Sequence, residues 1–159
     1  MIQPLARASL LTALLCLAVT GAPAATYVRG NDGDPETLDQ HKTSTVAEAH
    51  ILRDLYEGLL AYDAAAKVVP GVAESWTVSD DGLVYTFKLR PGVKWQKTKT
   101  FTPTRDFNAD DVVFSIERMW SKDNPYHMVS GGNYEYFAGS GLPELIKGVR
   151  KVDDLTVEV

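Results

Sequence analysis

Three pairs of adjacent aspartates are the residues whose type and spacing could carry out acid–base chemistry: Asp80-Asp81, Asp110-Asp111 and Asp153-Asp154. Neighbouring carboxyl groups can serve as a general acid and a general base. Each pair, however, lies in a predicted turn or in the first turn of a predicted helix, where aspartate stabilises the backbone. We therefore interpret all three pairs as structural.

Metal and nucleophilic chemistry lack the spacing that they require. His41, Glu48 and His50 do not form the H-E-x-x-H pattern that places two imidazoles on one helical face, and His127 stands alone. Residues 31–34 lack the ligand order and the distal glutamate of a calcium loop. The sequence has no G-x-S-x-G elbow, P-loop or dinucleotide fingerprint. We predict a protein without catalytic residues, metal ligands or cofactors; the alternative enzyme interpretation is an exported hydrolase.

Length and composition indicate about one globular domain, with 159 residues of which 45% are hydrophobic and 23% charged. The formal net charge is −5, and lysine and arginine form no block. Nucleic acid is therefore not an expected partner.

Residues 1–24 have the order of a secretory signal peptide. Arg7 forms the positive n-region, residues 10–19 the apolar h-region, and the A-P-A motif at 22–24 the cleavage site. The alternative is a buried N-terminal helix. The only cysteine lies in this leader, so residues 25–159 suit an exported protein without disulfides in a bacterial periplasm.

Two helices are predicted in residues 25–159. Thr45 and Glu48 form a capping box that begins the first helix. Its apolar face would comprise Val46, Ala49, Leu52, Leu55, Tyr56, Leu59 and Leu60. Asn108 is the expected N-cap of the second helix. The buried face of that helix would comprise Val112, Val113, Ile116, Met119 and Trp120.

Strand patterns surround these helices. Residues 27–29 predict a short strand, and the alternation in residues 76–90 predicts a hairpin turning at Asp81-Gly82. Residues 149–159 predict a second hairpin turning at Asp153-Asp154. The chain stops inside this last strand pattern, which needs a neighbour. We expect a fragment of a longer protein; the alternative is a natural C-terminal edge strand.

The stretch NPYHMVSGGNYEYF, residues 124–137, combines four aromatic side chains with a glycine pair and a single charge. Asn124-Pro125 would end the second helix, and Gly131-Gly132 would let the loop turn. We expect Tyr134, Tyr136 and Phe137 to pack the loop down. Trp76, Trp95 and Trp120 are expected in the core.

Three segments occur in a characteristic order: VVPGVAESWTVSDDGLVYTFKLRPGVKW, then FNADDVVFSIER, then NPYHMVSGGNYEYFAGSGLPELIKGVRKVDDLTVEV. In this order they resemble the extracellular solute-binding proteins of family 5, the periplasmic peptide-binding components of ABC transporters. The resemblance covers residues 27–159. The third segment is similar to the dipeptide-binding branch, whereas LDQHKTSTVAEAHILRDLYEGLL is similar to the oligopeptide-binding branch.

The resemblance implies a mixed α/β fold, the N-terminal part of lobe I of a two-lobed, class II periplasmic binding protein. The ligand would be held between two lobes, with the anchors for its charged ends in a second lobe absent here. We expect a monomeric periplasmic receptor that binds a dipeptide or oligopeptide and delivers it to an ABC permease in the inner membrane. The alternative within the family is a receptor for haem, a nickel complex or another non-peptide solute.

The same resemblance implies two ligand-contacting places. A strand-like backbone grip falls on Ser44, Thr45 and Val46, just before the first helix; the alternative role of these residues is helix capping. The second contact falls on Tyr126, the tyrosine of the (S/N)-P-Y step; the alternative is a tyrosine of the core or one that packs the loop.

Overall fold

The computed structural model describes residues 26–159, and the chain divides into two units, residues 1–30 and 31–159. The predicted signal peptide lies outside the described residues. Residues 26–30 form neither helix nor strand, so the strand predicted at 27–29 is wrong. Tyr27 and Val28 are 83% and 85% exposed, and a lone extended segment gains no ladder hydrogen bonds.

The first helix of residues 31–159 is α2 (Val46–Leu55), and its capping box is confirmed. The hydroxyl of Thr45 accepts the N–H of Glu48, while the Glu48 carboxylate accepts the N–H of Thr45. The helix ends at Leu55, where Tyr56 turns to extended backbone. The prediction that its apolar face continues to Leu60 is wrong, because Leu60 begins strand β1 (Leu60–Tyr62) instead.

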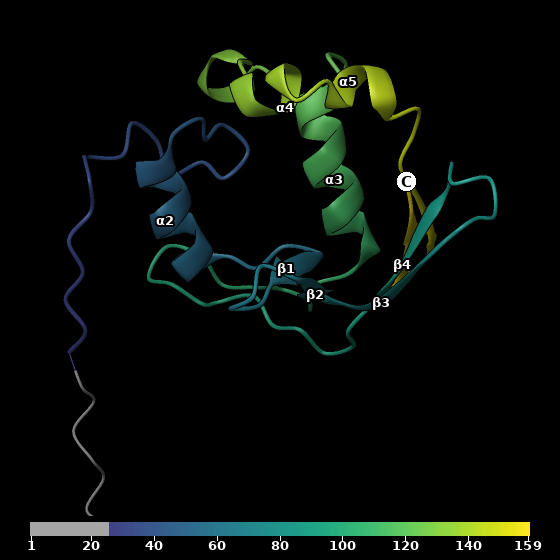
Figure 1. Cartoon of the computed structure of the whole chain (residues 1–159), viewed down its shortest axis with the longest axis horizontal. Coiled ribbons are helices and arrows are strands. Elements are labelled where there is room, and N and C mark those ends of the chain that lie inside the picture. The colour runs from purple at the N-terminus through teal and green to yellow at the C-terminus, as the bar shows by residue number, and fades with distance from the viewer. Residues whose placement is uncertain (1–25) are drawn as a thin grey trace, which may run out of the picture. The chain divides into compact units, whose positions relative to one another are not determined.

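Four strands form an antiparallel sheet in the order β3-β4-β6-β5 (Figure 1). Their bounds are β3 (Ala73–Val78), β4 (Tyr85–Leu89), β5 (Arg150–Asp153) and β6 (Thr156–Glu158). Both predicted hairpins are confirmed as β3-β4 and β5-β6. A separate antiparallel pair consists of β1 (Leu60–Tyr62) and β2 (Val68–Pro70).

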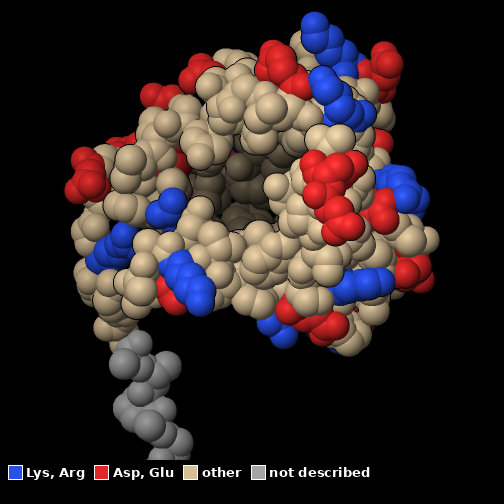
Figure 2. Space-filling model, turned by 45° about the vertical axis from the view of Figure 1, so that its right-hand side comes forward, with Lys and Arg blue, Asp and Glu red and all other residues tan. Residues whose placement is uncertain are grey.

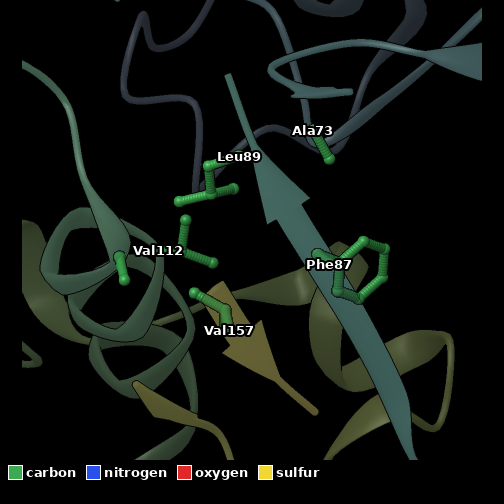
Figure 3. Close-up of a cluster of buried hydrophobic side chains, with 6 residues drawn as sticks. Ala73, Phe87, Leu89, Val112 and Val157 are labelled. Atoms are coloured by element: carbon green, nitrogen blue, oxygen red, sulfur yellow. The ribbon is translucent and has the colours of Figure 1, made fainter. Parts of the chain in front are cut away.

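Helix α3 (Ala109–Trp120) packs against this sheet through one side of its surface. The Asn108 cap is confirmed: its side chain accepts the N–H of Asp110, and Asp111 accepts the N–H of Asn108. Leu89, Val112 and Val157 meet between the helix and strands β4 and β6 (Figure 3). Within the described chain this cluster is the core that fixes the position of α3 over the sheet.

Short helices follow α3 and lie across its C-terminal end (Figure 1). They are η1 (Val129–Gly131), α4 (Glu135–Gly139) and α5 (Leu142–Leu145). Tyr134 and Phe137 are buried as predicted, whereas Tyr136 is 71% exposed. Tyr136 differs because it is adjacent to Phe137 on a helix, where neighbouring side chains point to different sides.

The tryptophans are less buried than the sequence suggested. Trp76 and Trp120 are half-buried, and Trp76 packs against the core cluster. Trp95 is 40% exposed and contacts Phe107 edge to face at 5.7 Å. None of the helices in residues 26–159 has the length and apolar character needed to cross a membrane.

Candidate functional site

The segment before α2 is held by one buried carboxylate. Glu48, 1% exposed, accepts the N–H groups of Ser44 and Thr45 with one oxygen, at 3.1 and 3.2 Å. Its other oxygen accepts the N–H of Glu36 at 3.0 Å. The N–H of Ser44 is the largest of the effects that lower the pKa of Glu48, since these donors stabilise the charged form.

This arrangement reduces the number of backbone groups in residues 44–46 that a ligand could bind. The N–H groups of Ser44 and Thr45 point to Glu48, and the carbonyl of Thr45 accepts the N–H of Ala49. Helix capping is therefore established for Thr45. A ligand would meet the rest of Ser44 and the 65% exposed side chain of Val46.

Tyr126 lies in a turn just beyond α3 and is 54% exposed. The Asn124 side chain accepts its N–H at 2.9 Å, which fixes the backbone of the turn. Its ring meets that of Phe114 edge to face at 5.4 Å. Tyr126 is thus supported on one side and open on another, unlike a core tyrosine.

Arg118, near the end of α3, is 9% exposed and binds the loop that precedes α2. Its two terminal nitrogens donate to the two oxygens of Asp39, at 2.9 and 2.5 Å. Nη1 also lies 2.9 Å from Nδ1 of His41, and Nε donates to the carbonyl of Tyr126 at 3.3 Å. One guanidinium therefore contacts Tyr126 and the loop that leads into residues 44–46.

The chemistry of these contacts defines the protonation of His41. Arginine has only donors, so Nδ1 of His41 must accept and the imidazole is neutral. Burial, followed by the charge of Arg118, lowers the pKa of His41. The hydrogen bond from Arg118 lowers the pKa of Asp39, which stays ionised.

His127 and Tyr134 form further polar contacts near Arg118. Nδ1 of His127 donates to the carbonyl of Arg118 at 2.8 Å, and the Tyr134 hydroxyl donates to the carbonyl of His127 at 2.8 Å. The Arg118 guanidinium carbon lies 5.7 Å from the centre of the Tyr134 ring. Burial raises the pKa of Tyr134.

A pocket of about 320 Å³ opens beside the start of α2. Its lining is Ser44, Glu135, Tyr136, Gly139 and Ser140. Figure 2 shows the molecule hollowed on one face, with largely uncharged walls and acidic side chains on part of the rim. Concave, mainly apolar surfaces with a few polar groups are typical of ligand sites.

The structure thus brings Ser44 to a pocket wall, but the lining of that pocket does not include Tyr126. In the described part of the chain, no hydrogen bond or ring contact joins Tyr126 to residues 44–46. Their link is indirect and runs through Arg118. Sequence analysis missed this link because Asp39 and Arg118 are 79 residues apart, beyond any local spacing rule.

One member of each aspartate pair, Asp81, Asp111 and Asp153, has the structural role that the sequence predicted. Asp81 accepts the Ser79 hydroxyl and the N–H of Leu83 in the first hairpin turn. Asp153 accepts the N–H of Leu155 in the second. Among residues 26–159, no group of three His, Cys, Asp or Glu side chains is arranged to hold a metal ion.

Comparison with known proteins gives consistent matches. The model of the family described as "Bacterial extracellular solute-binding proteins, family 5 Middle" matches residues 67–159. The dipeptide-binding protein of Escherichia coli (strain K12) is 51% identical over 138 residues, 85% of this chain and 26% of that protein. Heme-binding protein A of Haemophilus influenzae is 53% identical over 108 residues, 67% of this chain and 20% of that protein.

Two solved structures resemble the fold closely. HbpA2 from Haemophilus parasuis gives a TM-score of 0.76 at 46% identity, covering 79% of this chain and 25% of that one. A dipeptide binding protein from Pseudoalteromonas sp. SM9913, in complex with Met-Leu, gives a TM-score of 0.76 at 38% identity. The match covers 80% of this chain and 26% of that one. These matches confirm the mixed α/β fold. The chain spans about a quarter of the length of the curated relatives that it matches.

Proposed function

Because this chain belongs to the bacterial extracellular solute-binding proteins of family 5, we propose that it is part of a receptor for small peptides. The receptor acts in the periplasm and delivers its ligand to an ABC permease. The family consists of solute-binding proteins rather than enzymes, so the hydrolase interpretation is not retained. The observation that carries the proposal is the 51% identity with a dipeptide-binding protein over 85% of this chain.

The site suggests how a peptide is held. A receptor for peptides of varied sequence binds the backbone, which all peptides share. Ser44 lines the pocket and contacts the ligand backbone, while Thr45 holds the segment in place as the helix cap. Val46 and the exposed Tyr126 provide apolar and hydroxyl contacts.

Export and oligomeric state complete the proposal. Residues 1–24 direct secretion and are removed, and the receptor is a monomer that closes around one ligand. Closure of two lobes around the peptide signals the loaded state to the permease. The anchors for the charged ends of the peptide lie outside this chain.

A haem receptor is the second candidate, favoured by the 53% identity with heme-binding protein A over 108 residues. The exposed aromatic rings of Tyr126 and Tyr136 could pack against a flat porphyrin as well as against a peptide. The two candidates therefore differ in ligand and not in the location of the site.

Ligand binding by the complete gene product distinguishes these candidates. After removal of copurifying ligand by unfolding and refolding, thermal shifts are measured with Met-Leu, a tetrapeptide, haemin and nickel–histidine. A ligand at about 100 times its Kd stabilises the folded state by about 2.7 kcal/mol. We expect a shift with a peptide. A shift with haemin or nickel–histidine but with neither peptide refutes the proposal.

Substitution of Tyr126 tests its part in the site. Tyr126→Phe keeps the ring contact with Phe114 and removes only the hydroxyl, so affinity should fall about three- to tenfold without loss of stability. The matched control is Tyr62→Phe, since Tyr62 on β1 is 73% exposed. Equal affinities of the two variants would remove Tyr126 from the site.

A further inference from the structure

The contacts of Arg118 reach two segments that are distant in the sequence. On one side it binds Asp39 and His41, and on the other it donates to the carbonyl of Tyr126. A guanidinium is a rigid planar fork, so its acceptors are held at fixed relative positions. The two segments therefore share one rigid connector.

Hydrogen bonds within the loop that contains Asp39 also restrict the position of Ser44. The carbonyl of Asp39 accepts the N–H of Lys42 at 2.9 Å, and the Asp39 carboxylate accepts the N–H of His41 at 3.1 Å. These bonds close a tight turn only two residues before Ser44. Ser44 is then held by Glu48, so the path from Arg118 to the pocket wall has little freedom.

The loop on the Tyr126 side is equally constrained. The carbonyl of Arg118 accepts Nδ1 of His127 at 2.8 Å, and the carbonyl of His127 accepts the Tyr134 hydroxyl. A second, more exposed hydrogen bond joins the two loops: the Lys42 ammonium donates to the carbonyl of Ser130. Lysine is a flexible point charge, so the directional connector is Arg118.

We propose that Arg118 is a positioning residue that holds residues 44–46 and Tyr126 in the relative arrangement that the ligand requires. This inference rests on the peptide-binding function proposed above. Arg118 does not touch the ligand; it acts through Asp39 and through the Tyr126 carbonyl. Its loss lowers affinity by disordering the two contact segments relative to each other.

The test variant is Arg118→Lys in the complete gene product. Lysine keeps the charge but has three donors in place of the planar fork, so it cannot make all four contacts to Asp39, His41 and Tyr126. The matched control is Arg105→Lys. Arg105 forms an equivalent two-point pair with Asp111 near the start of α3, at 2.6 and 2.8 Å, and contacts neither segment.

Hydrogen exchange of the ligand-free protein tests the positioning directly. Arg118→Lys should accelerate amide exchange in both residues 36–46 and residues 124–129, whereas Arg105→Lys should do so in neither. Faster exchange in one segment alone, or in none, overturns the proposal. This measurement needs no ligand, so it decides the role of Arg118 even if the protein binds no peptide.

Binding of Met-Leu tests the consequence. Arg118→Lys should weaken affinity about tenfold, and Arg105→Lys should leave it unchanged. In the Arg118→Lys background, Tyr126→Phe should lower the affinity for Met-Leu by a smaller factor than in the parent protein, because Tyr126 is already displaced. Unchanged affinity, or fully additive effects, would mean that Arg118 serves stability only. Absence of Met-Leu binding by the parent protein counts instead against the peptide-binding function.

Discussion

The Glu48 carboxylate accepts the N–H of Ser44 at 3.1 Å. A buried charge therefore holds the backbone of the residue that we propose to face the ligand. Glu48 also accepts the N–H groups of Thr45 and Glu36. Three backbone donors from two parts of the loop before α2 therefore converge on one side chain. This convergence makes the start of α2 a rigid wall.

Glu48→Gln should destabilise the protein by about 1 to 3 kcal/mol, because an amide has one acceptor oxygen and leaves buried N–H groups unsatisfied. Urea denaturation of the complete gene product measures the loss. Glu57→Gln is the matched control, since Glu57 is exposed, and should change stability by less than about 0.5 kcal/mol. Equal stabilities would contradict the convergence on Glu48.

Stability should fall in two steps as the pH decreases. The folded-state pKa of His41 is lowered from its ordinary value of 6.5, so the unfolded chain takes up this proton first. The contribution of His41 is complete above pH 6.5 and is lost as the pH falls below it. The pKa of Asp39 is lowered from 3.8, so its contribution is present above that pH and is lost below it.

Denaturation midpoints measured from about pH 8 to about pH 2 separate the two steps. His41→Asn should flatten the upper step, because the amide oxygen accepts near the Nδ1 position without titrating. Asp39→Asn should reduce the lower step without abolishing it, because Glu48, whose pKa is also lowered, contributes in the same range. The control is His50→Asn, since His50 on α2 has no hydrogen bond to Arg118 or Asp39. An upper step that persists in His41→Asn would rule out His41 as its source.

Leu89→Ala should lower the free energy of unfolding by about 2 to 5 kcal/mol. Leu89 is 2% exposed between α3 and the sheet, and removal of its side chain leaves a cavity. Leu83→Ala in the neighbouring hairpin turn is the control, because Leu83 is 76% exposed. Thermal and urea denaturation of both variants test the assignment of the core. A similar loss from the two substitutions would show that the core lies elsewhere.

Gly132→Ala should destabilise the loop between η1 and α4. Gly132 has a φ of +66°, and an added Cβ would lie 3.3 Å from the carbonyl of His127 and 2.7 Å from the Met128 sulfur. The left-handed backbone costs a side-chain-bearing residue about 1 to 2 kcal/mol. Urea denaturation measures this cost.

Gly148→Ala is the control for this substitution, since its added Cβ meets nothing within 4 Å and its φ is not positive. It should be neutral or stabilising by up to about 1 kcal/mol. Comparable destabilisation by both changes would argue against strain at Gly132.

Elements with local signals were predictable from the sequence. The Thr45–Glu48 and Asn108–Asp111 caps use residues three apart, and both hairpins use short alternating runs around a turn. The first helix was predicted too long, because Leu59 and Leu60 have helical spacing. Pairing of Leu60 with Pro70, ten residues later, overrides that spacing.

The candidate site was predictable only in part. Tyr126 and residues 44–46 were selected by resemblance, and their exposure in the structure is compatible with ligand contact. The exposure of Tyr136 was not foreseen, since an aromatic residue in a loop is equally consistent with packing. The pocket beside Ser44 combines this residue of the loop before α2 with residues in and just after α4, which no local pattern connects.

The sequence by itself determined the family, the caps, the hairpins and the places where α2 and α3 begin, because these depend on neighbouring residues and on short periodic patterns. The tertiary structure alone decided that Arg118 meets Asp39, 79 residues earlier, and that Glu48 is buried beneath Ser44. Charged side chains are usually exposed, so only the fold reveals which of them are enclosed and must find partners.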